Sequence, residues 1–247
     1  VGDAHWLKRD FVRMAEAYEH ATSLLDWSLT AWQRLGDAYR LQGRIEEART
    51  AYQRAALAEF PPGTSVYYRA LGIAYQTAGW NEEAIAALNK SVAIRGTLQS
   101  NILLSSMYIN QRNWEAAVAA ANEAHRLDIW SDQPYIALGL VEQERGDSEA
   151  AIKDHEQALF RHPQSDALLY LAPTIAFAHG REAALAESQG LVGYKLGFAA
   201  PLLAVANIQG GLGRIDDALA AARQAWAWEP VNSSAAVRLG NIQQILG

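Results

Sequence analysis

Small residues return along this chain about every 34 positions, in three columns that keep the same phase. The first column, with spacings of 36, 33, 34, 33 and 34, consists of Ala48, Ala84, Ala117, Ala151, Ala184 and Ala218. The second consists of Gly36, Gly72, Ser105, Gly139, Ala172, Ala206 and Gly240. The third, small except at one leucine, consists of Ala21, Ala55, Ser91, Ala124, Ala158, Leu191 and Ala225. Because small side chains let two helix backbones approach closely, the columns predict a stack of repeated helix-turn-helix units.

The clearest unit runs from Trp32 to Pro62 and consists of two short predicted helices. Apolar and small residues follow three- and four-residue steps in both halves, as a helix with one buried face requires. Gly43 marks the turn between the halves, and Pro61 and Pro62 end the second half. Helices this short are marginal in water, because nucleation is costly and packing supplies most of the stability. The unit must therefore stack on copies of itself.

This first unit carries the pattern Trp–x2–Leu–Gly–x2–Tyr, followed by Ala–x3–aromatic–x2–Ala and a proline. Its residues in that pattern are Trp32, Leu35, Gly36, Tyr39, Ala48, Tyr52, Ala55 and Pro61. With a period near 34, the pattern resembles the tetratricopeptide repeat (TPR) family. The resemblance implies an all-α fold: a right-handed α-solenoid superhelix of about six stacked helix-turn-helix repeats with flanking N- and C-terminal helices.

The columns place the expected parts along the chain. Residues 1–27 form an N-terminal helix (roughly Asp3–Leu25), in phase with the second helix of a degenerate repeat, and residues 232–247 form a C-terminal capping helix. Six repeats fill residues 28–231, at about 29–62, 65–97, 98–130, 132–164, 165–197 and 199–231. The fifth repeat departs from the pattern with Pro173 in its first helix and with Gly190 and Gly193 in its second, which predicts a kink.

In the family, the first helix of each repeat lines a concave groove, which the resemblance carries over to this chain as a partner-binding band. The expected groove residues are Gln33, Arg34, Asp37, Arg40, Arg69, Ile73, Gln76, Ile102, Ser106, Ile109, Ile136, Leu140, Leu169, Tyr170, Phe177 and Leu203. The same band includes Pro173, Ala176 and Asn207. Its basic start and apolar continuation favour an extended or helical peptide, with apolar side chains in pockets and an acidic group near the arginines.

An alternative interpretation keeps some of these residues between helices, so that the groove is partly closed by its own side chains. Two familiar groove types of the family are absent. The Lys/Asn carboxylate clamp is replaced by Gln33, Asp37, Arg69 and Ile73, so binding of chaperone tails is not implied. The asparagine ladder of the glycosyltransferase-linked arrays is also missing.

The bulk composition limits the partners. A net charge of −6 argues against a nucleic-acid-binding surface, and the lack of cysteine excludes disulfides and thiolate metal sites. The longest apolar run, around Leu196–Val205, is too short to insert into a membrane. We expect a soluble protein, with the cytoplasm favoured over the periplasm and the extracellular space. Since the chain begins with Val1, we expect it to be a fragment or a processed piece.

No pattern of catalytic chemistry appears in the sequence. His155 and His162 are seven residues apart, but Pro163 marks the end of their helix, so a metal-ligand pair is not expected. The acidic pairs that open the second helices, such as Glu46 and Glu47, complement the helix dipole. There is no phosphate loop and no nucleophile elbow. The sequence therefore predicts a protein that is not an enzyme and has no metal and no cofactor.

Several tryptophans lie outside the family pattern: Trp80, Trp114, Trp130, Trp226 and Trp228. Most should bury against the next repeat, while an exposed subset at one edge could anchor a partner. The leading functional hypothesis is a non-catalytic scaffold that binds a protein or peptide partner in the groove. The alternatives are a structural subunit that forms a homo-oligomer through its terminal helices, and an accessory domain that recruits substrate for a larger protein.

Overall fold

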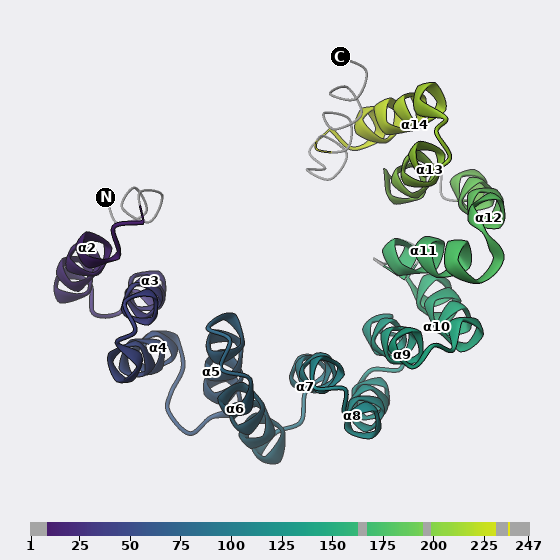
Figure 1. Ribbon diagram of the computed structural model, residues 1–247. Coiled ribbons are helices and arrows are strands. Elements are labelled where there is room, and N and C mark those ends of the chain that lie inside the picture. The colour runs from purple at the N-terminus through teal and green to yellow at the C-terminus, as the bar shows by residue number, and fades with distance from the viewer. Residues whose placement is uncertain (1–8, 163–166, 195–198, 231–236, 238–247) are drawn as a thin grey trace. The chain divides into compact units, whose positions relative to one another are not determined.

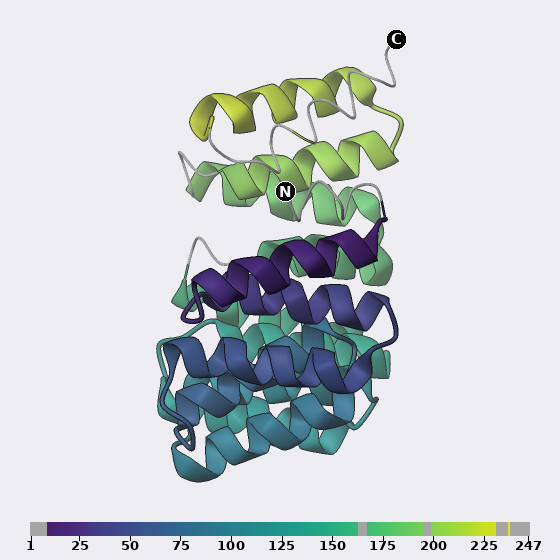
Figure 2. The same ribbon diagram turned by 90° about the vertical axis from the view of Figure 1, so that its left-hand side faces the viewer.

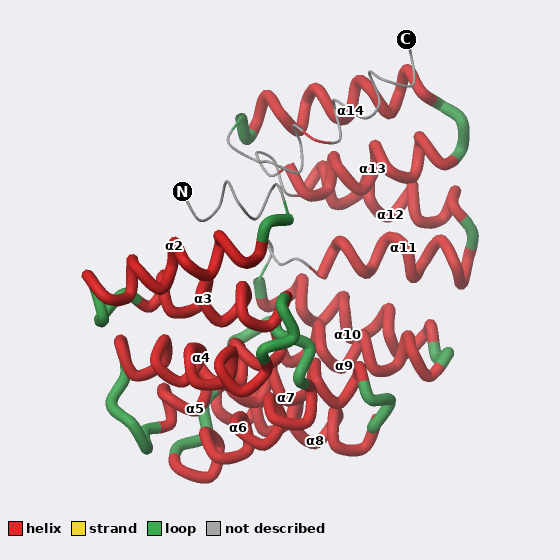
Figure 3. The backbone as a smooth tube through the Cα atoms, turned by 60° about the vertical axis from the view of Figure 1, so that its left-hand side comes forward, coloured by secondary structure: helices red, strands yellow, loops and turns green. Residues whose placement is uncertain are grey.

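The computed structural model describes residues 9–162, 167–194, 199–230 and 237. Thirteen helices and no strand occur in these ranges (Figures 1 and 3). They are α2 Phe11–Leu24, α3 Leu29–Leu41, α4 Ile45–Glu59, α5 Ser65–Thr77, α6 Asn81–Ile94, α7 Leu98–Asn110, α8 Trp114–Leu127, α9 Gln133–Arg145, α10 Ser148–Arg161, α11 Ala167–His179, α12 Arg181–Tyr194, α13 Ala199–Gly211 and α14 Ile215–Trp228. The predicted all-α class is confirmed.

Consecutive helices pack against one another in pairs. The most extensive contacts join α3 to α4, α5 to α6, α9 to α10 and α13 to α14. Figure 2 shows α2, α3 and α4 side by side, with the chain reversing direction at each turn. The contacts divide the chain into two compact units, Val1–Met107 and Tyr108–Gly247, and the division falls within α7.

A residue with left-handed backbone lies in the turn that joins the two helices of each pair. The residues with positive φ at these turns are Gly43 (76°), Gly79 (82°), Arg112 (56°), Gly146 (85°), Gly180 (91°) and Gly213 (79°). Glycine has no Cβ and adopts this conformation without strain, whereas a side chain such as that of Arg112 does so at a cost. The turn geometry therefore repeats even where the residue type does not.

The N-terminal helix is shorter than its sequence predicts. Arg9 has φ 55° and lies 34 positions before Gly43, so it has the turn conformation seen between helix pairs. Asp10 then caps α2 by accepting a hydrogen bond from the Arg13 amide at 3.2 Å. The helix consequently begins at Phe11, and the prediction that one helix starts at Asp3 is wrong for residues 9 and 10. Residues 3–8 of that prediction lie outside the described ranges, as does nearly all of 232–247.

Three glycines of the second column, Gly36, Gly72 and Gly139, lie directly beneath bulky side chains of the following helix. A Cβ added to Gly36 would lie 2.6 Å from the Tyr52 ring, one added to Gly72 would lie 2.6 Å from Leu88, and one added to Gly139 would lie 2.4 Å from the His155 ring. Each bulky residue follows its glycine by 16 positions. Where the column holds Ser or Ala instead, the residue 16 positions later is also small, as in Ser105 and Ala121, Ala172 and Ser188, and Ala206 and Ala222. The close helix approach predicted from the columns is confirmed at the three glycines.

Helix α11 continues through Pro173, which lies exposed within it. Proline has no N–H to donate to the preceding turn. The Thr174 hydroxyl, one residue later, donates to the Tyr170 carbonyl at 2.7 Å.

None of the helices in the described ranges is both long enough and apolar enough to cross a membrane.

Candidate partner-binding site

Two of the expected groove residues of α3, Arg34 and Asp37, face each other. Asp37 accepts a hydrogen bond from the Tyr52 hydroxyl at 2.8 Å, and its other oxygen lies 3.8 Å from Arg34 Nη1. Burial raises the pKa of the Tyr52 hydroxyl, the hydrogen bond to Asp37 raises it further, and Arg40 partly opposes this effect. Gln33 is half-buried on the same helix. Since Asp37 already faces Arg34, the charges here are partly balanced within the repeat.

On α5 the same band is more open. Ile73 is 43% exposed, while Arg69 and Gln76 on either side of it are half-buried. Among the described residues no carboxylate lies within 4.0 Å of the Arg69 guanidinium. Ile102 and Ser106 are half-buried on α7. In the first unit, therefore, Arg69 and Ile73 are the expected groove residues best placed to contact another molecule.

In the second unit the expected residues have different environments. Phe177 is 84% exposed on α11, whereas Tyr170 on the same helix is half-buried and stacks on His155 at 5.6 Å between ring centroids. The others that are half-buried are Ile109, Ile136 and Leu140. Leu169 belongs to α11, but its side chain lies outside the described part of the structure.

Leu203 is not a groove residue. Its side chain is only 6% exposed and belongs to the hydrophobic core of the second unit. The reason is the position of α13, which packs against α11, α12 and α14 and buries residues on all its sides. The expectation that Leu203 lines the groove is therefore corrected.

A pocket of about 230 Å³ lies where two first helices, α11 and α13, approach each other. Its lining consists of Leu168, Ala172, Pro173, Ala176, Arg181, Ala204, Asn207, Ile208 and Gly211. Pro173, Ala176 and Asn207 belong to the band predicted from the sequence. Arg181, the first residue of α12, was missed, and its guanidinium donates to the Gly211 carbonyl. Alanines at 172, 176 and 204 leave the space open, and this cluster of small residues on two neighbouring first helices was a usable signal.

Comparisons with known proteins agree with this geometry. The tetratricopeptide repeat family model matches residues 27–97. This segment of the chain therefore contains tetratricopeptide repeats. No curated protein sequence matches it.

Solved structures extend the fold similarity to nearly the whole length of this chain. A tetratricopeptide repeat protein from Parabacteroides merdae is 14% identical with a TM-score of 0.56, covering 98% of this chain and 96% of that one. PilF from Pseudomonas aeruginosa is 18% identical with a TM-score of 0.53, covering 88% and 97%. A chain of the APC/C hetero-tetramer Cut9-Hcn1 is 16% identical with a TM-score of 0.52, and the similarity covers 92% of this chain but 45% of that one. At these identities the similarity shows the fold alone.

Proposed function

We propose that this TPR protein is a non-catalytic interaction scaffold that binds a peptide segment or a helix of a partner protein on its first helices. TPR domains generally mediate protein–protein interactions. The observation that carries the proposal is the pocket between α11 and α13, because it opens on two first helices and includes three positions of the predicted band.

The size and chemistry of this pocket favour a side chain of a peptide over a free small molecule. Pockets for drug-sized ligands measure roughly 300–1,000 Å³, and the volume here is about 230 Å³. The walls are mainly alanine, leucine, isoleucine and proline, which suits an apolar anchor. Asn207 is exposed at the lining, and its amide can both donate to and accept from the backbone of a bound segment.

A displayed library of random peptides, selected on the intact chain, would test this function. Peptides that bind the wild type should bind Asn207→Trp about tenfold more weakly or not at all, because the indole would fill the pocket. Gln224→Trp is the matched control, since Gln224 is also exposed, lies on the second helix α14 and lies outside the pocket. Selected peptides that bind both variants as well as they bind the wild type would refute the assignment of the site to this pocket.

A further inference from the structure

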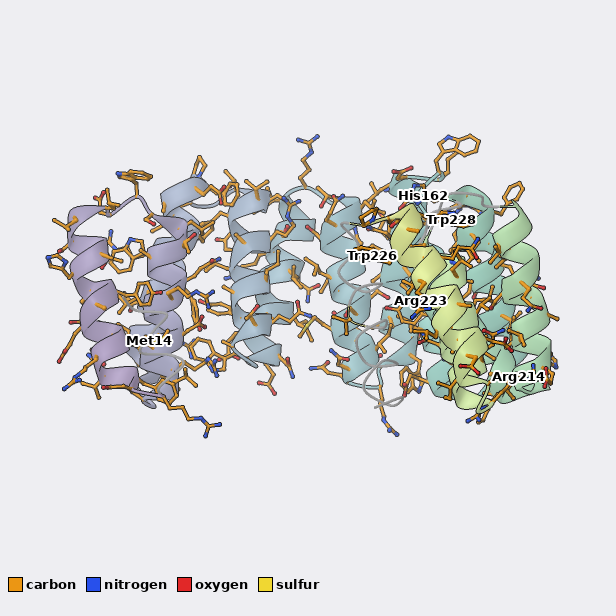
Figure 4. All side chains as sticks on the ribbon, turned by 90° about the horizontal axis from the view of Figure 1, so that it is seen from above. Met14, His162, Arg214, Arg223, Trp226 and Trp228 are labelled. Atoms are coloured by element: carbon orange, nitrogen blue, oxygen red, sulfur yellow. The ribbon has the colours of Figure 1, made fainter. Side chains whose placement is uncertain are left out.

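Large exposed apolar side chains gather at one end of the second helices in the second unit. Their exposed fractions are 38% for Leu127, 55% for Ile129, 79% for Trp130, 83% for Phe160 and 46% for Trp226. All five lie in the last turn of α8, α10 or α14 or in the residues directly after α8. In Figure 4, Trp226, Trp228 and His162 lie toward the same edge of the unit, and Arg214, which precedes α14, lies toward the opposite one. Single exposed apolar residues are ordinary, but a group of large ones marks an interaction surface.

The ends of α8 and α10 are joined by polar contacts at this edge. Arg161 Nε donates to the Ile129 carbonyl at 3.4 Å, and His162 Nδ1 lies 3.8 Å from Asp132 Oδ2. Phe160 directly precedes Arg161 and His162 in the chain. We use the name loop edge for Leu127, Ile129, Trp130 and Phe160. An aromatic side chain carries roughly 150–250 Å² of surface, so Trp130 and Phe160 together expose about 300 Å².

The loop that carries Trp130 has a defined structure, although the indole itself faces solvent. The Trp130 amide donates to Asp128 Oδ1 at 3.0 Å, and the Ser131 amide donates to the Asp128 carbonyl at 3.3 Å. The Gln133 amide, in turn, donates to the Ser131 hydroxyl at 3.3 Å. These bonds fix the backbone from which the ring projects. An aromatic side chain on a preorganised loop loses little conformational entropy when a partner covers it, and tryptophan is enriched among hot-spot residues.

Of the charged side chains next to the loop edge, Arg126 is exposed but pairs with Glu123 at 2.7 Å. Arg161 is turned inward, since its guanidinium lies 3.9 Å from the centre of the Tyr135 ring and its amines donate to the Tyr135 hydroxyl and to Gln157. Asp128 is exposed beside Trp130. The second unit contains sixteen Asp and Glu against ten Lys and Arg, whereas the first contains eleven of each, so the second unit carries the whole net charge. Two copies of this edge would therefore repel each other, while a cationic partner would be attracted.

We propose that the loop edge is a second protein-binding surface, whose partner is a segment with an apolar anchor flanked by lysine or arginine. The surface shares no residue with the pocket between α11 and α13 and goes beyond the function proposed for that pocket. Trp130 and Phe160 supply the apolar contacts. The exposed carboxylate of Asp128 and the negative charge of the unit select a cationic segment.

The test uses the intact chain and two designed amphipathic peptides with the same leucine and tryptophan face and with either lysine or glutamate on the other face. Fluorescence anisotropy should show that the lysine peptide binds the wild type about tenfold more tightly than the glutamate peptide, with an affinity that falls as salt is added. The double variant Trp130→Ala/Phe160→Ala should lose this binding. Trp27→Ala is the matched control, because Trp27 is 68% exposed in the loop before α3 of the charge-balanced first unit, and it should bind like the wild type.

Circular dichroism should show the same helicity for the wild type and the double variant, because both substituted rings are exposed. Three outcomes would overturn the proposal: equal binding of the two peptides, no binding of the lysine peptide, or unchanged binding by the double variant. A fourth is concentration-dependent self-association of the wild type, seen by light scattering and abolished in the double variant, since a second copy would then cover the loop edge.

Discussion

Replacing His155 with leucine should make this protein less sensitive to acid. The imidazole is fully buried in the second unit, and neither ring nitrogen has a hydrogen-bond partner. Tyr170 stacks on the ring, and the Gly139 backbone lies against it. Because burial disfavours the charged form, it lowers the pKa of His155 from 6.5 to about 4. At neutral pH the ring is therefore an uncharged packing residue.

The sign and size of the acid effect follow from this shift. Between pH 6.5 and 4 the unfolded chain binds a proton at this histidine that the folded chain does not, so the stability present above pH 6.5 is lost as the pH falls. One pKa unit corresponds to about 1.4 kcal/mol, and the loss between pH 7 and pH 5 amounts to about 2 kcal/mol. Asp154 works in the opposite direction, because burial foremost, and then Glu142, raise the pKa of its carboxyl to about 6.

The measurement is urea unfolding of the wild type and of His155→Leu at pH 7 and pH 5. Leucine suits this site, since Leu88 packs over Gly72 as His155 packs over Gly139. The free energy of unfolding of the variant, minus that of the wild type, should grow by about 2 kcal/mol on acidification. Asp154 is present in both proteins and drops out of this difference, and Asp154→Asn in each background checks that it does. A difference that stays the same at the two pH values would refute the assignment of a neutral, buried His155.

Two further predictions concern the helix pairs. Gly36→Ala should lower the free energy of unfolding by about 1–3 kcal/mol, because the new methyl group would lie 2.6 Å from the Tyr52 ring. In the Tyr52→Ala background the ring is absent, so an equal loss there would contradict this cause. Arg112→Gly should raise the melting temperature, since a non-glycine residue at φ 56° costs about 1 kcal/mol of strain, whereas Gly146→Ala at the equivalent turn should lower it. A lower melting temperature for Arg112→Gly would show that contacts of the arginine side chain outweigh the strain.

The sequence predicted the helix pairs well because each pair repeats the same physical requirements. The pattern predicted a close helix approach at Gly36, Gly72 and Gly139. In the structure these glycines face the side chains of Tyr52, Leu88 and His155, respectively. The start of the N-terminal helix could not be predicted in the same way. The turn there is made by Arg9, and nothing in an arginine signals a positive φ.

The site was harder to predict than the fold. Helix α13 is apolar on all sides, so its sequence does not tell which leucine faces a groove, and Leu203 was misplaced for that reason. Arg181 reaches the pocket from the start of a second helix, outside the positions that the family pattern assigns to binding. The exposure of Trp130 depends on how the loop after α8 is held, which no periodicity encodes.

The size matching between residues 16 positions apart has a consequence for how such a chain can lengthen. Tyr52 and its glycine, or His155 and its glycine, both come from a single helix pair. A duplication or loss of one whole pair therefore carries both members together and leaves no mismatched volume behind. Enlarging the glycine of one pair, by contrast, requires a smaller residue 16 positions later, as at Ala172 and Ser188. The array can thus gain or lose whole pairs without creating such a mismatch.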